Sequence, residues 1–325
     1  MAKEIKKIAI LTSGGDAPGM NAAVKAIADA AFSNNLEAYL VYEGYKGLVE
    51  DNIKKIDSLD ELAGIEDQGG TILYTARYPQ FKEEEVRKRG KSNLDDKGID
   101  ALVVIGGDGS FMGAKLLSDL GVNTVGIPGT IDNDIQSSEF TLGFFTAIET
   151  LKDLIQKVKD TAESHNRLFV IETYGHGKGD LPLWATKDLG INILSIPEKK
   201  LEVDEIVELS RKEREAGKRA IMVIVAEFLY DAKALSKTIE EKTGIESKTI
   251  IPLQIQRGGK PVEKDKELAR ILGKYAVEVL ISGKTGITVG VKDWKPYDTE
   301  ILEAVELPKT NYQQMIEVYN KERKG

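Results

Sequence analysis

Three short segments rich in glycine, hydroxyl groups and carboxylates each follow an apolar run of the sequence. They are residues 12–16 (Thr-Ser-Gly-Gly-Asp), 106–110 (Gly-Gly-Asp-Gly-Ser) and 128–134 (Pro-Gly-Thr-Ile-Asp-Asn-Asp). Glycine after a buried strand lets backbone N–H groups approach a phosphate, and a following helix adds its positive end. The segments therefore indicate a phosphate site. For any one segment alone, the alternative is that its glycines only form a tight turn between a strand and the next element.

The carboxylates of these segments suit phosphoryl transfer assisted by a metal ion. Asp108 lies among glycines, and Mg²⁺ prefers one or two carboxylates together with phosphate oxygens and water. Thr130, Asp132 and Asp134 share one face of an extended segment. One carboxylate there can take the proton of a substrate hydroxyl while a second helps to hold Mg²⁺. The alternatives are a helix cap at Asp108 and an Asx turn at 132–134.

Four further charged residues complete the candidate set. Arg77 can neutralise the charge that spreads over a transferred phosphoryl group. Arg167, Glu227 and Arg257 lie at or near the ends of apolar runs, where they could bind the phosphate and hydroxyls of a sugar phosphate. For each of them alone, an ordinary surface charge is the alternative.

The elements that must position these residues follow from eight short runs rich in valine and isoleucine, which alternate with helical stretches. The runs cover residues 8–11, 38–41, 101–105, 124–127, 168–171, 191–196, 220–225 and 250–255. This alternation predicts βαβ units and mostly parallel sheets covered by helices. Ligands of such sheets bind beyond the carboxyl ends of the strands, where the three polar segments fall. The amphipathic stretch 146–159 predicts a long helix.

We expect an α/β protein of two doubly wound, mostly parallel, Rossmann-like lobes, with the active site in the cleft between them. The main boundary is expected near Gly143. The first lobe would then contain residues 1–143 and about 257–306, and the second residues 144–256 and about 307–325.

Composition excludes several classes of function. The 325 residues carry a formal charge of -8, which opposes a nucleic-acid surface. There is no cysteine, which excludes disulfides and thiolate zinc sites, and two histidines are too few for a typical histidine-based metal site. Because no apolar run reaches about 18 residues, we expect no membrane span and a cytoplasmic protein.

Four motifs in this order resemble the bacterial ATP-dependent 6-phosphofructokinases over nearly the whole chain, in the group with glycine at the positions that determine the use of ATP. They cover residues 11–23, 104–110, 128–135 and 255–259. The resemblance implies a glycolytic homotetramer that transfers phosphate from Mg-ATP to the 1-hydroxyl of fructose 6-phosphate. It also implies that the first lobe binds ATP and Mg²⁺ and the second binds the sugar phosphate.

The resemblance also assigns roles to residues. Asp132 would be the catalytic base, Thr130 would orient the transferred group, and Arg77 and His176 would stabilise its charge. Asp108 and Asp134 would lie on the magnesium side. The nucleotide positions are Gly15, Arg77, Tyr78, Gly107, Asp108, Gly109 and Ser110. The sugar-phosphate positions are Thr130, Ile131, Asp132, Arg167, Tyr174, Gly175, His176, Glu227, Lys248, Gln254 and Arg257, with Arg167 and Lys248 reaching a neighbouring subunit's site.

Two glycines favour ATP as the donor, while four other positions depart from the family. Relatives that use pyrophosphate generally carry Asp and Lys at the positions of Gly109 and Gly129. The usual Met-Gly-Arg reads Tyr-Gly-His at 174–176, the usual Arg is Lys248, and the usual His is Gln254. These departures leave two alternatives open: a kinase for another sugar phosphate, or a nucleotide-binding regulatory subunit with little turnover.

The positions that match the family's effector pocket have lost positive charge. Family members bind a nucleoside diphosphate or phosphoenolpyruvate there through several arginines. The matching residues are Lys25, Asp29, Asn52 and Lys159, and a metal-binding glutamate is matched by Asn192. We therefore expect weakened allosteric control.

Overall fold

The computed structural model describes residues 4–191, 193–308 and 310–322, and it divides into two compact units. The first unit comprises Met1–Ile131, Ile135–Thr146 and Arg257–Pro308. The second comprises Asp132–Asp134, Ala147–Gln256 and Lys309–Gly325. Asp132–Asp134 lies inside the sequence range expected of the first lobe, yet it groups with the second unit.

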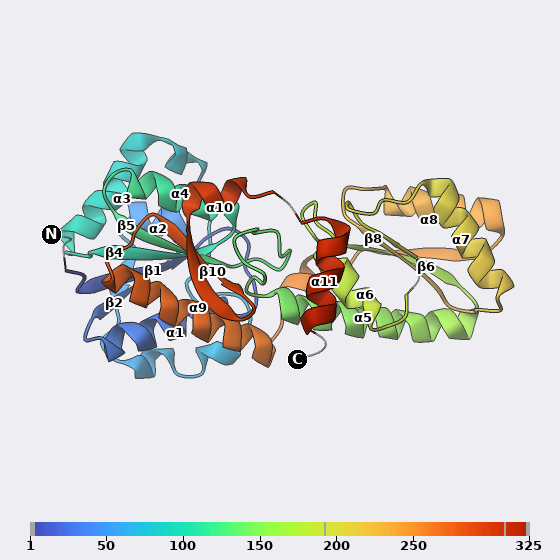
Figure 1. The fold of residues 1–325 in the computed structure, drawn as a ribbon, viewed down its shortest axis with the longest axis horizontal. Helices are drawn as coiled ribbons and strands as arrows, with labels where there is room; N and C mark the ends of the chain where they lie inside the picture. The colour runs from blue at the N-terminus through green and yellow to red at the C-terminus, as the bar shows by residue number, and fades with distance from the viewer. Residues whose placement is uncertain (1–3, 192, 309, 323–325) are drawn as a thin grey trace. The chain divides into compact units, whose positions relative to one another are not determined.

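A seven-stranded sheet forms the centre of the first unit, in the order β11-β10-β5-β4-β1-β2-β3 (Figure 1). Its strands are β1 (Lys7–Thr12), β2 (Glu37–Val41), β3 (Ile53–Lys55), β4 (Ala101–Gly106), β5 (Asn123–Pro128), β10 (Ile287–Lys292) and β11 (Lys295–Glu300). The five inner strands are parallel, and the two edge strands β3 and β11 are antiparallel to their neighbours. The inner strands β1, β4 and β5 are buried almost throughout, as expected of a sheet covered on both faces.

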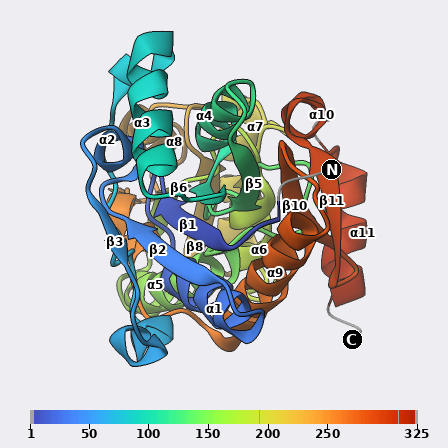
Figure 2. The same cartoon turned by 90° about the vertical axis from the view of Figure 1, so that its left-hand side faces the viewer.

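Helices cover the two faces of this sheet. They are α1 (Met20–Ser33), α2 (Gly44–Val49), α3 (Glu84–Asp96), α4 (Asp108–Ser118), α9 (Glu263–Ile281) and α10 (Ile301–Glu306), with 3-10 turns η1 (Leu59–Leu62), η2 (Ile65–Asp67) and η3 (Pro79–Lys82). Figure 2 shows α1 and α9 side by side on one face and α3 and α4 on the other. The carboxyl ends of β1 and β4 lead into α1 and α4, so the polar segments lie where parallel sheets place ligands.

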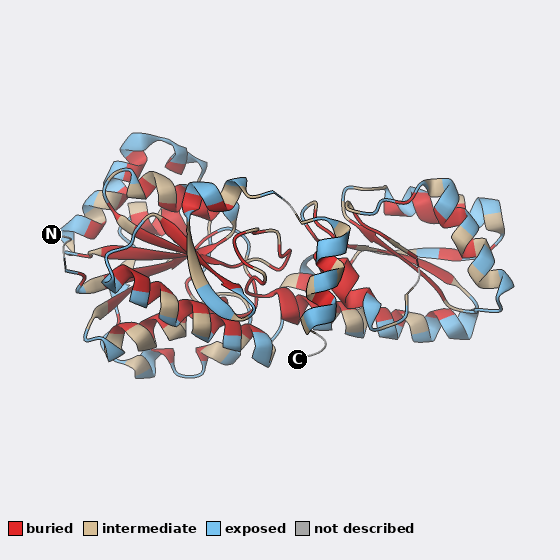
Figure 3. Ribbon diagram, viewed as in Figure 1, coloured by how far each residue is buried: buried red, intermediate tan, exposed pale blue. Residues whose placement is uncertain are grey.

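The second unit contains a four-stranded parallel sheet in the order β7-β8-β6-β9. Its elements are α5 (Phe144–His165, which begins in the first unit), β6 (Leu168–Thr173), α6 (Asp180–Lys187), β7 (Ile193–Ser195), α7 (Val203–Glu215), β8 (Ile221–Ala226), α8 (Ala232–Thr243), β9 (Ser247–Ile250), η4 (Leu253–Arg257) and α11 (Tyr312–Glu322). Apolar residues of α7 and α8 bury one face of the sheet. Figure 3 shows buried strands inside helices whose outer faces are exposed.

Seven of the eight predicted strands coincide with strands of the structure, and the predicted helix at 146–159 is the middle of α5. The prediction of a strand at 250–255 was wrong, because β9 ends at Ile250 and the chain turns into η4. Pro252 has no N–H for a ladder hydrogen bond, and Leu253 has a φ of 48°. The strand that pairs with β6 is instead the more polar segment Ser247–Ile250.

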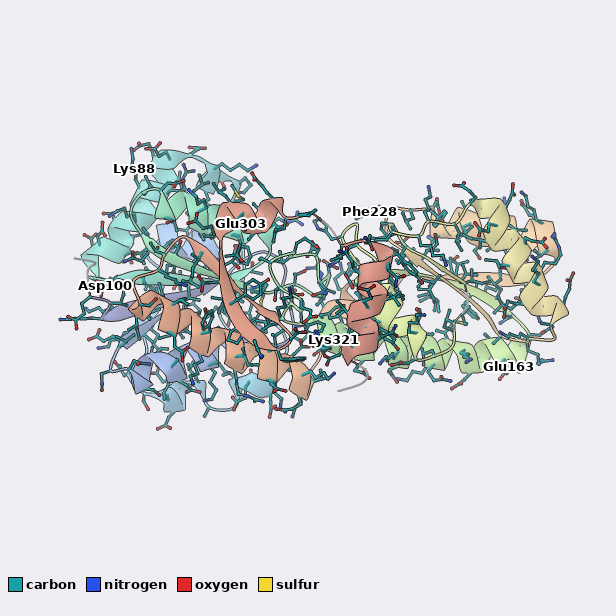
Figure 4. All side chains as sticks on the ribbon, in the orientation of Figure 1. Lys88, Asp100, Glu163, Phe228, Glu303 and Lys321 are labelled. Carbon is teal, nitrogen blue, oxygen red and sulfur yellow. The ribbon has the colours of Figure 1, made fainter. Side chains whose placement is uncertain are left out.

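Acidic side chains secure the amino-terminal edges of both sheets. Asp100, just before β4, accepts hydrogen bonds from the backbone N–H groups of Lys6 (2.9 Å) and Lys7 (3.0 Å). Glu163, near the end of α5, accepts one from the N–H of Ala220 (3.1 Å). Figure 4 labels both acids. Among the described residues, no helix combines the length and apolar character needed to cross a bilayer.

Candidate functional site

The turn after β1 packs tightly against the turn after β4. The N–H of Ser13 donates to the carbonyl of Ile105 (2.9 Å), and the hydroxyl of Thr75 donates to the carbonyl of Gly14 (2.7 Å). A Cβ at Gly106 would overlap the Ser13 carbonyl oxygen, so only glycine allows this approach. The first two glycine segments therefore lie against each other in the first unit.

Arg257 lies directly against the first of these turns. A Cβ at Gly15 would overlap the Nη1 atom of Arg257, which places the guanidinium on the backbone at Gly15. The sequence predicted that Arg257 binds the sugar phosphate, and it predicted Gly15 at the nucleotide. The structure brings the two together, so the arginine lies where a phosphate approaching this turn would meet it.

The turn after β4 forms the N-terminus of α4 and faces open space. Gly107 is the N-cap residue, and Asp108 and Gly109 are exposed in the first turn of the helix. A Cβ at Gly107 or Gly109 would meet no atom within 4 Å. Ser110 is buried, and its carbonyl accepts the hydroxyl of Tyr45 (2.5 Å). A helix N-terminus attracts anions, and beside phosphate an exposed Asp108 favours an intervening cation.

The segment that carries Arg77 is anchored by Asn21, which lies in the motif 11–23 but was not predicted as a site residue. Asn21, fully buried in α1, accepts a hydrogen bond from the N–H of Ile72 (2.7 Å) and donates one to the carbonyl of Gln68 (3.1 Å). Farther along, Tyr78 packs against the core of the first unit, and Arg77 is exposed. The only signal in the sequence was an asparagine within the motif 11–23, and its burial could not be predicted from it.

In the second unit, the segment Asp132–Asp134 is joined to the turn that follows β6. Asp132 and Asn133 are buried, and Asn133 has a φ of 51°, in the left-handed region. The ring Nδ1 of His176 lies 2.9 Å from Oδ2 of Asp134. This hydrogen bond raises the pKa of His176 above its ordinary value, and burial opposes the rise. The ring is thus more often protonated at neutral pH than a free histidine.

Several predicted sugar-phosphate positions meet at the carboxyl ends of β6 and β8. The N–H of Tyr174 donates to Oε1 of Gln256 (2.9 Å), and the N–H of His176 donates to Oε1 of Glu227 (2.8 Å). Glu227 in turn donates its backbone N–H to the carbonyl of Thr173 (2.8 Å). Gln254 is exposed in η4. Gln256, buried and holding this turn, was not predicted as a site residue.

Arg167 and Lys248 lie at the opposite end of the same sheet. Arg167 precedes β6, and Lys248 pairs in register with Phe169, one residue into that strand. Both cations contact Oε1 of Glu246, at 2.8 Å from Arg167 Nη2 and 3.2 Å from Lys248 Nζ. Because a strand rises about 3.3 Å per residue, about 20 Å separates them from Tyr174. The structure therefore does not bring these two predicted residues to the others.

The residues that could serve a metal ion are few. Within the described part of the chain, no three side chains among His, Asp and Glu cluster as a metal centre would require. Asp108 is exposed at a helix N-terminus, and Asp134 has 13% of its side chain exposed. Each carboxylate by itself suits a Mg²⁺ ion, which takes one or two carboxylates and its other ligands from phosphate oxygens and water.

The expected effector positions show weak positive charge. Lys25 is paired with Asp29 (2.8 Å) on α1. Lys159 lines a small pocket with Glu213 and Lys218, which form an ion pair (2.5 Å). Asn192 lies outside the described residues.

Comparisons with known proteins complete this description. The family model described as Phosphofructokinase matches residues 7–280. The chain is 46% identical over 314 residues to the ATP-dependent 6-phosphofructokinase of Bacillus subtilis (strain 168), covering 97% of this chain and 98% of that one. It is also 46% identical to the protein of the same name from Bacillus cereus (strain B4264) over 301 residues, 93% of this chain and 94% of the other.

Solved structures of phosphofructokinases are similar to this chain in fold. The phosphofructokinase of Saccharomyces cerevisiae superimposes with a TM-score of 0.87 at 33% identity, over 97% of this chain but only 48% of the yeast chain. The pyrophosphate-dependent phosphofructokinase of Marinobacter aquaeolei, with a TM-score of 0.84 over 98% of this chain and 91% of its own at 19% identity, shares the fold. The chain belongs to the phosphofructokinase family.

Proposed function

We propose that this protein transfers the γ-phosphoryl group of Mg-ATP to the 1-hydroxyl of fructose 6-phosphate, giving fructose 1,6-bisphosphate and ADP, in the cytoplasm as a step of glycolysis. The observation that carries the proposal is the 46% identity, over 97% of the chain, to a protein named ATP-dependent 6-phosphofructokinase. It is supported by the glycine turns, Asp108 and Arg257 of the first unit, and by Tyr174, His176 and Glu227 at the carboxyl ends of β6 and β8 in the second unit.

In this mechanism Asp132 accepts the proton of the 1-hydroxyl as its oxygen attacks the γ-phosphorus. The bond between the γ-phosphorus and the bridging oxygen breaks, and that oxygen leaves with ADP. Thr130 orients the transferred group, and Arg77 and His176 neutralise charge on its oxygens. Tyr174 and Glu227 hold the acceptor. The proximity of Arg257 to Gly15 leads us to assign it to phosphate binding as well.

The nucleotide side of the proposal uses the first unit. The Gly15 turn and the start of α4 bind the phosphates through backbone N–H groups. Asp108 of the first unit and Asp134 of the second unit would hold Mg²⁺, which would neutralise charge on the phosphates. ATP is favoured as the donor because the space beside Gly109 is open, where a side chain would intrude. A Cβ added at Gly129 would lie 3.0 Å from Cγ2 of Ile105 and 3.0 Å from Cε of Met20, so a lysine there would require repacking.

We propose a homotetramer in which neighbouring subunits share sites. The separation of Arg167 and Lys248 from the other predicted sugar-phosphate residues supports this arrangement. One copy of the chain cannot bring this pair and the residues near Tyr174 to the same sugar phosphate. Exposed apolar side chains in the second unit also suit self-association, among them Phe228, which is 78% exposed (labelled in Figure 4), and Ile255, which is 63% exposed.

A second candidate is a kinase for another phosphorylated sugar, favoured by Tyr174, His176 and Gln254 at the acceptor positions. We also propose weak allosteric control, supported by the Lys25–Asp29 pair and by Asn52. Assays with ADP and phosphoenolpyruvate test the control, and a strong response to either would disprove it.

The first experiment is a coupled assay for ADP release from Mg-ATP with fructose 6-phosphate, tagatose 6-phosphate and glucose 6-phosphate as acceptors. Asp132→Asn serves as the control because it keeps the shape of the side chain and removes the base. We expect turnover with fructose 6-phosphate that falls by about 10²- to 10⁴-fold in the variant. A preference for another acceptor would select the second candidate. Nucleotide binding without turnover would indicate a regulatory subunit.

A further inference from the structure

Lys178 is a buried lysine that the mechanism above does not use. Only 5% of its side chain is exposed. Its Nζ lies 2.7 Å from Oδ2 of Asp180 and donates a hydrogen bond, also of 2.7 Å, to the backbone carbonyl of Asn133. Asn133 is the residue between the two carboxylates assigned to catalysis and to the metal.

Stability alone does not account for this arrangement. Asp180 is as buried as Lys178, and burial raises its pKa while the neighbouring ammonium opposes the rise. Removing two charges from water costs more than their attraction commonly returns, and well-packed apolar residues often replace such pairs without loss. A buried pair of this kind therefore calls for a geometric role, and the contact to Asn133 provides one.

The backbone held by Lys178 has an uncommon conformation. Asn133 has a φ of 51°, and residues other than glycine keep such a conformation when their surroundings enforce it. The carbonyl of Asn133 belongs to the peptide that leads into Asp134, so fixing that oxygen fixes the rotation of this peptide. The direction of the Asp134 side chain, and through Asn133 that of Asp132, depends on this rotation.

Lys178 is itself firmly placed. Its backbone N–H donates to the carbonyl of Gly175 (2.9 Å), and its carbonyl lies where any Cβ at Gly175 would be. The next residue, Gly179, donates its N–H to Oε1 of Glu198 (3.2 Å). Asp180 then begins α6. The ammonium is thus presented from a rigid turn, which is what a positioning group requires.

We propose that Lys178 is a positioning residue for phosphoryl transfer: its hydrogen bond to the Asn133 carbonyl sets the direction of the Asp132 and Asp134 carboxylates. The inference rests on the proposed function, because it presumes that these two carboxylates act on the substrates. Lys178 contacts no reacting atom in this scheme and acts through the backbone that it holds.

The test compares two variants that differ only in the donor to Asn133. Asp180→Asn removes the counter-charge but keeps the ammonium on the carbonyl. Lys178→Met combined with Asp180→Asn leaves a neutral, apolar replacement of similar length and no donor. Hydrogen exchange of peptides covering residues 131–136 is measured in both variants, together with kcat, the KM of each substrate and the thermal midpoint.

In the double variant we expect faster exchange at 131–136 and a kcat about 10- to 100-fold lower, with a smaller change in the KM of ATP. Asp180→Asn alone should retain slow exchange and most of the kcat. Wild-type exchange and kcat in a folded double variant would overturn the proposal. If the double variant does not fold, Lys178→Gln with Asp180→Asn replaces it; its amide ends one atom short of the ammonium, so we expect a partial loss of both properties, and no loss would overturn the proposal.

Exchange also separates this proposal from the proposed function. If the wild-type protein has no kinase activity, the proposed function fails, while the exchange at 131–136 still reports whether Lys178 fixes the segment. Faster exchange in an otherwise inactive protein would support the positioning role by itself.

Discussion

His176 makes one contact through its backbone, which holds its loop, and another through its ring, which changes the pKa of the imidazole. Its backbone N–H is bound by Glu227, and its ring is bound by Asp134, whose hydrogen bond raises the pKa of the ring. Arginine at this position would keep its charge at every pH and offer a planar fork to a phosphoryl group. Imidazole offers one nitrogen to Asp134 and only one more to a substrate. At this residue we therefore expect less stabilisation of the transition state.

Replacing His176 with arginine should raise kcat. The permanent charge and the second donor of arginine strengthen its contact with the transferred group. Loss of a single donor of this kind commonly lowers kcat by about 10²-fold or more, and we expect the arginine variant to raise kcat by at least about threefold. Steady-state assays at saturating fructose 6-phosphate and ATP measure the change. His176→Gln is the matched control, which keeps a hydrogen-bonding group without charge and should lower kcat. A lower kcat in the arginine variant would show that the site is tuned to imidazole.

Residue by residue, the sequence predicted the groups that lie in glycine turns at strand ends and missed those defined by burial. Asp108 and Asp132 could be proposed as site residues because parallel strands present their carboxyl ends to ligands. Lys178 could not, since a lysine gives no sign in the sequence that its ammonium is buried. The contact between Arg257 and Gly15 joins residues 242 positions apart, and no spacing rule reaches across that distance.

Buried polar side chains hold the functional loops to the helices and thereby set loop geometry at the scale of elements. Asn21 of α1 fixes the segment 68–72, which leads to Arg77, and Asp265 of α9 fixes the start of α5. Each of these side chains satisfies backbone groups that would otherwise be buried without partners.

Asn21→Leu should loosen the loop that carries Arg77. The change leaves the N–H of Ile72 and the carbonyl of Gln68 without their partner, at about 1–3 kcal/mol for each unsatisfied group. We expect lower stability in urea unfolding and faster hydrogen exchange over residues 68–77, with a higher KM for ATP. Asn34→Ala is the control, because the exposed Asn34 bonds only to its own helix. Unchanged exchange at 68–77 would contradict the anchoring role.

Asp265 predicts a pH dependence of stability. Its carboxylate accepts hydrogen bonds from the N–H groups of Gly143 (3.0 Å) and Thr146 (2.7 Å) at the start of α5, and burial raises its pKa to about 6. Because this pKa exceeds the ordinary value of 3.8, the folded state binds the proton more tightly than the unfolded state. The contribution of Asp265 to the free energy of unfolding should therefore fall as pH rises from about 4 to about 6 and stay constant above.

Urea unfolding of the wild type and Asp265→Asn at several pH values isolates this effect. The difference in free energy of unfolding between the wild type and the variant should change by up to about 3 kcal/mol between pH about 4 and about 6. This figure follows from 1.36 kcal/mol for each unit of pKa shift. Asp67→Asn is a control for which the pH dependence should run in the opposite direction. Lys266 and Lys260 lower the pKa of Asp67, so the contribution of Asp67 to the free energy of unfolding is lost as pH falls. A flat difference for Asp265 would show that its pKa is near the ordinary value.

Among the elements, the sequence predicted most inner strands and the edge strand β7, and it missed the inner strand β10 and the edge strands β3, β9 and β11. Buried parallel strands such as β4 are continuous apolar runs, which composition reveals. The strand β9 reads Ser-Lys-Thr-Ile and forms because it completes the edge beside β6, a tertiary preference that local sequence does not carry. The adjacent run at 250–255 was apolar but contained Pro252, which favours the turn into η4.

The position of Arg167 and Lys248 becomes informative at the scale of the whole molecule. Within one copy they lie at the amino ends of β6 and β9, whereas Tyr174 and Glu227 lie at the carboxyl ends of β6 and β8. Symmetric oligomers bring one patch of a subunit against a different patch of its neighbour in reciprocal pairs. In the proposed assembly, each site would therefore combine the Asp132 of one copy with the Arg167 of another.

Mixing two inactive variants tests this arrangement directly. Asp132→Asn lacks the base, and Arg167→Ala lacks the cation, so each alone should have little activity with fructose 6-phosphate. In a hybrid with shared sites, one site receives both intact residues and its reciprocal site receives neither. Random pairing at equal amounts should then restore about one quarter of wild-type activity in co-expressed protein. Static light scattering confirms that hybrids of the same size form. Hybrids that stay inactive would mean that each copy builds its site alone, and the contact of Arg167 with Glu246 would then be purely structural.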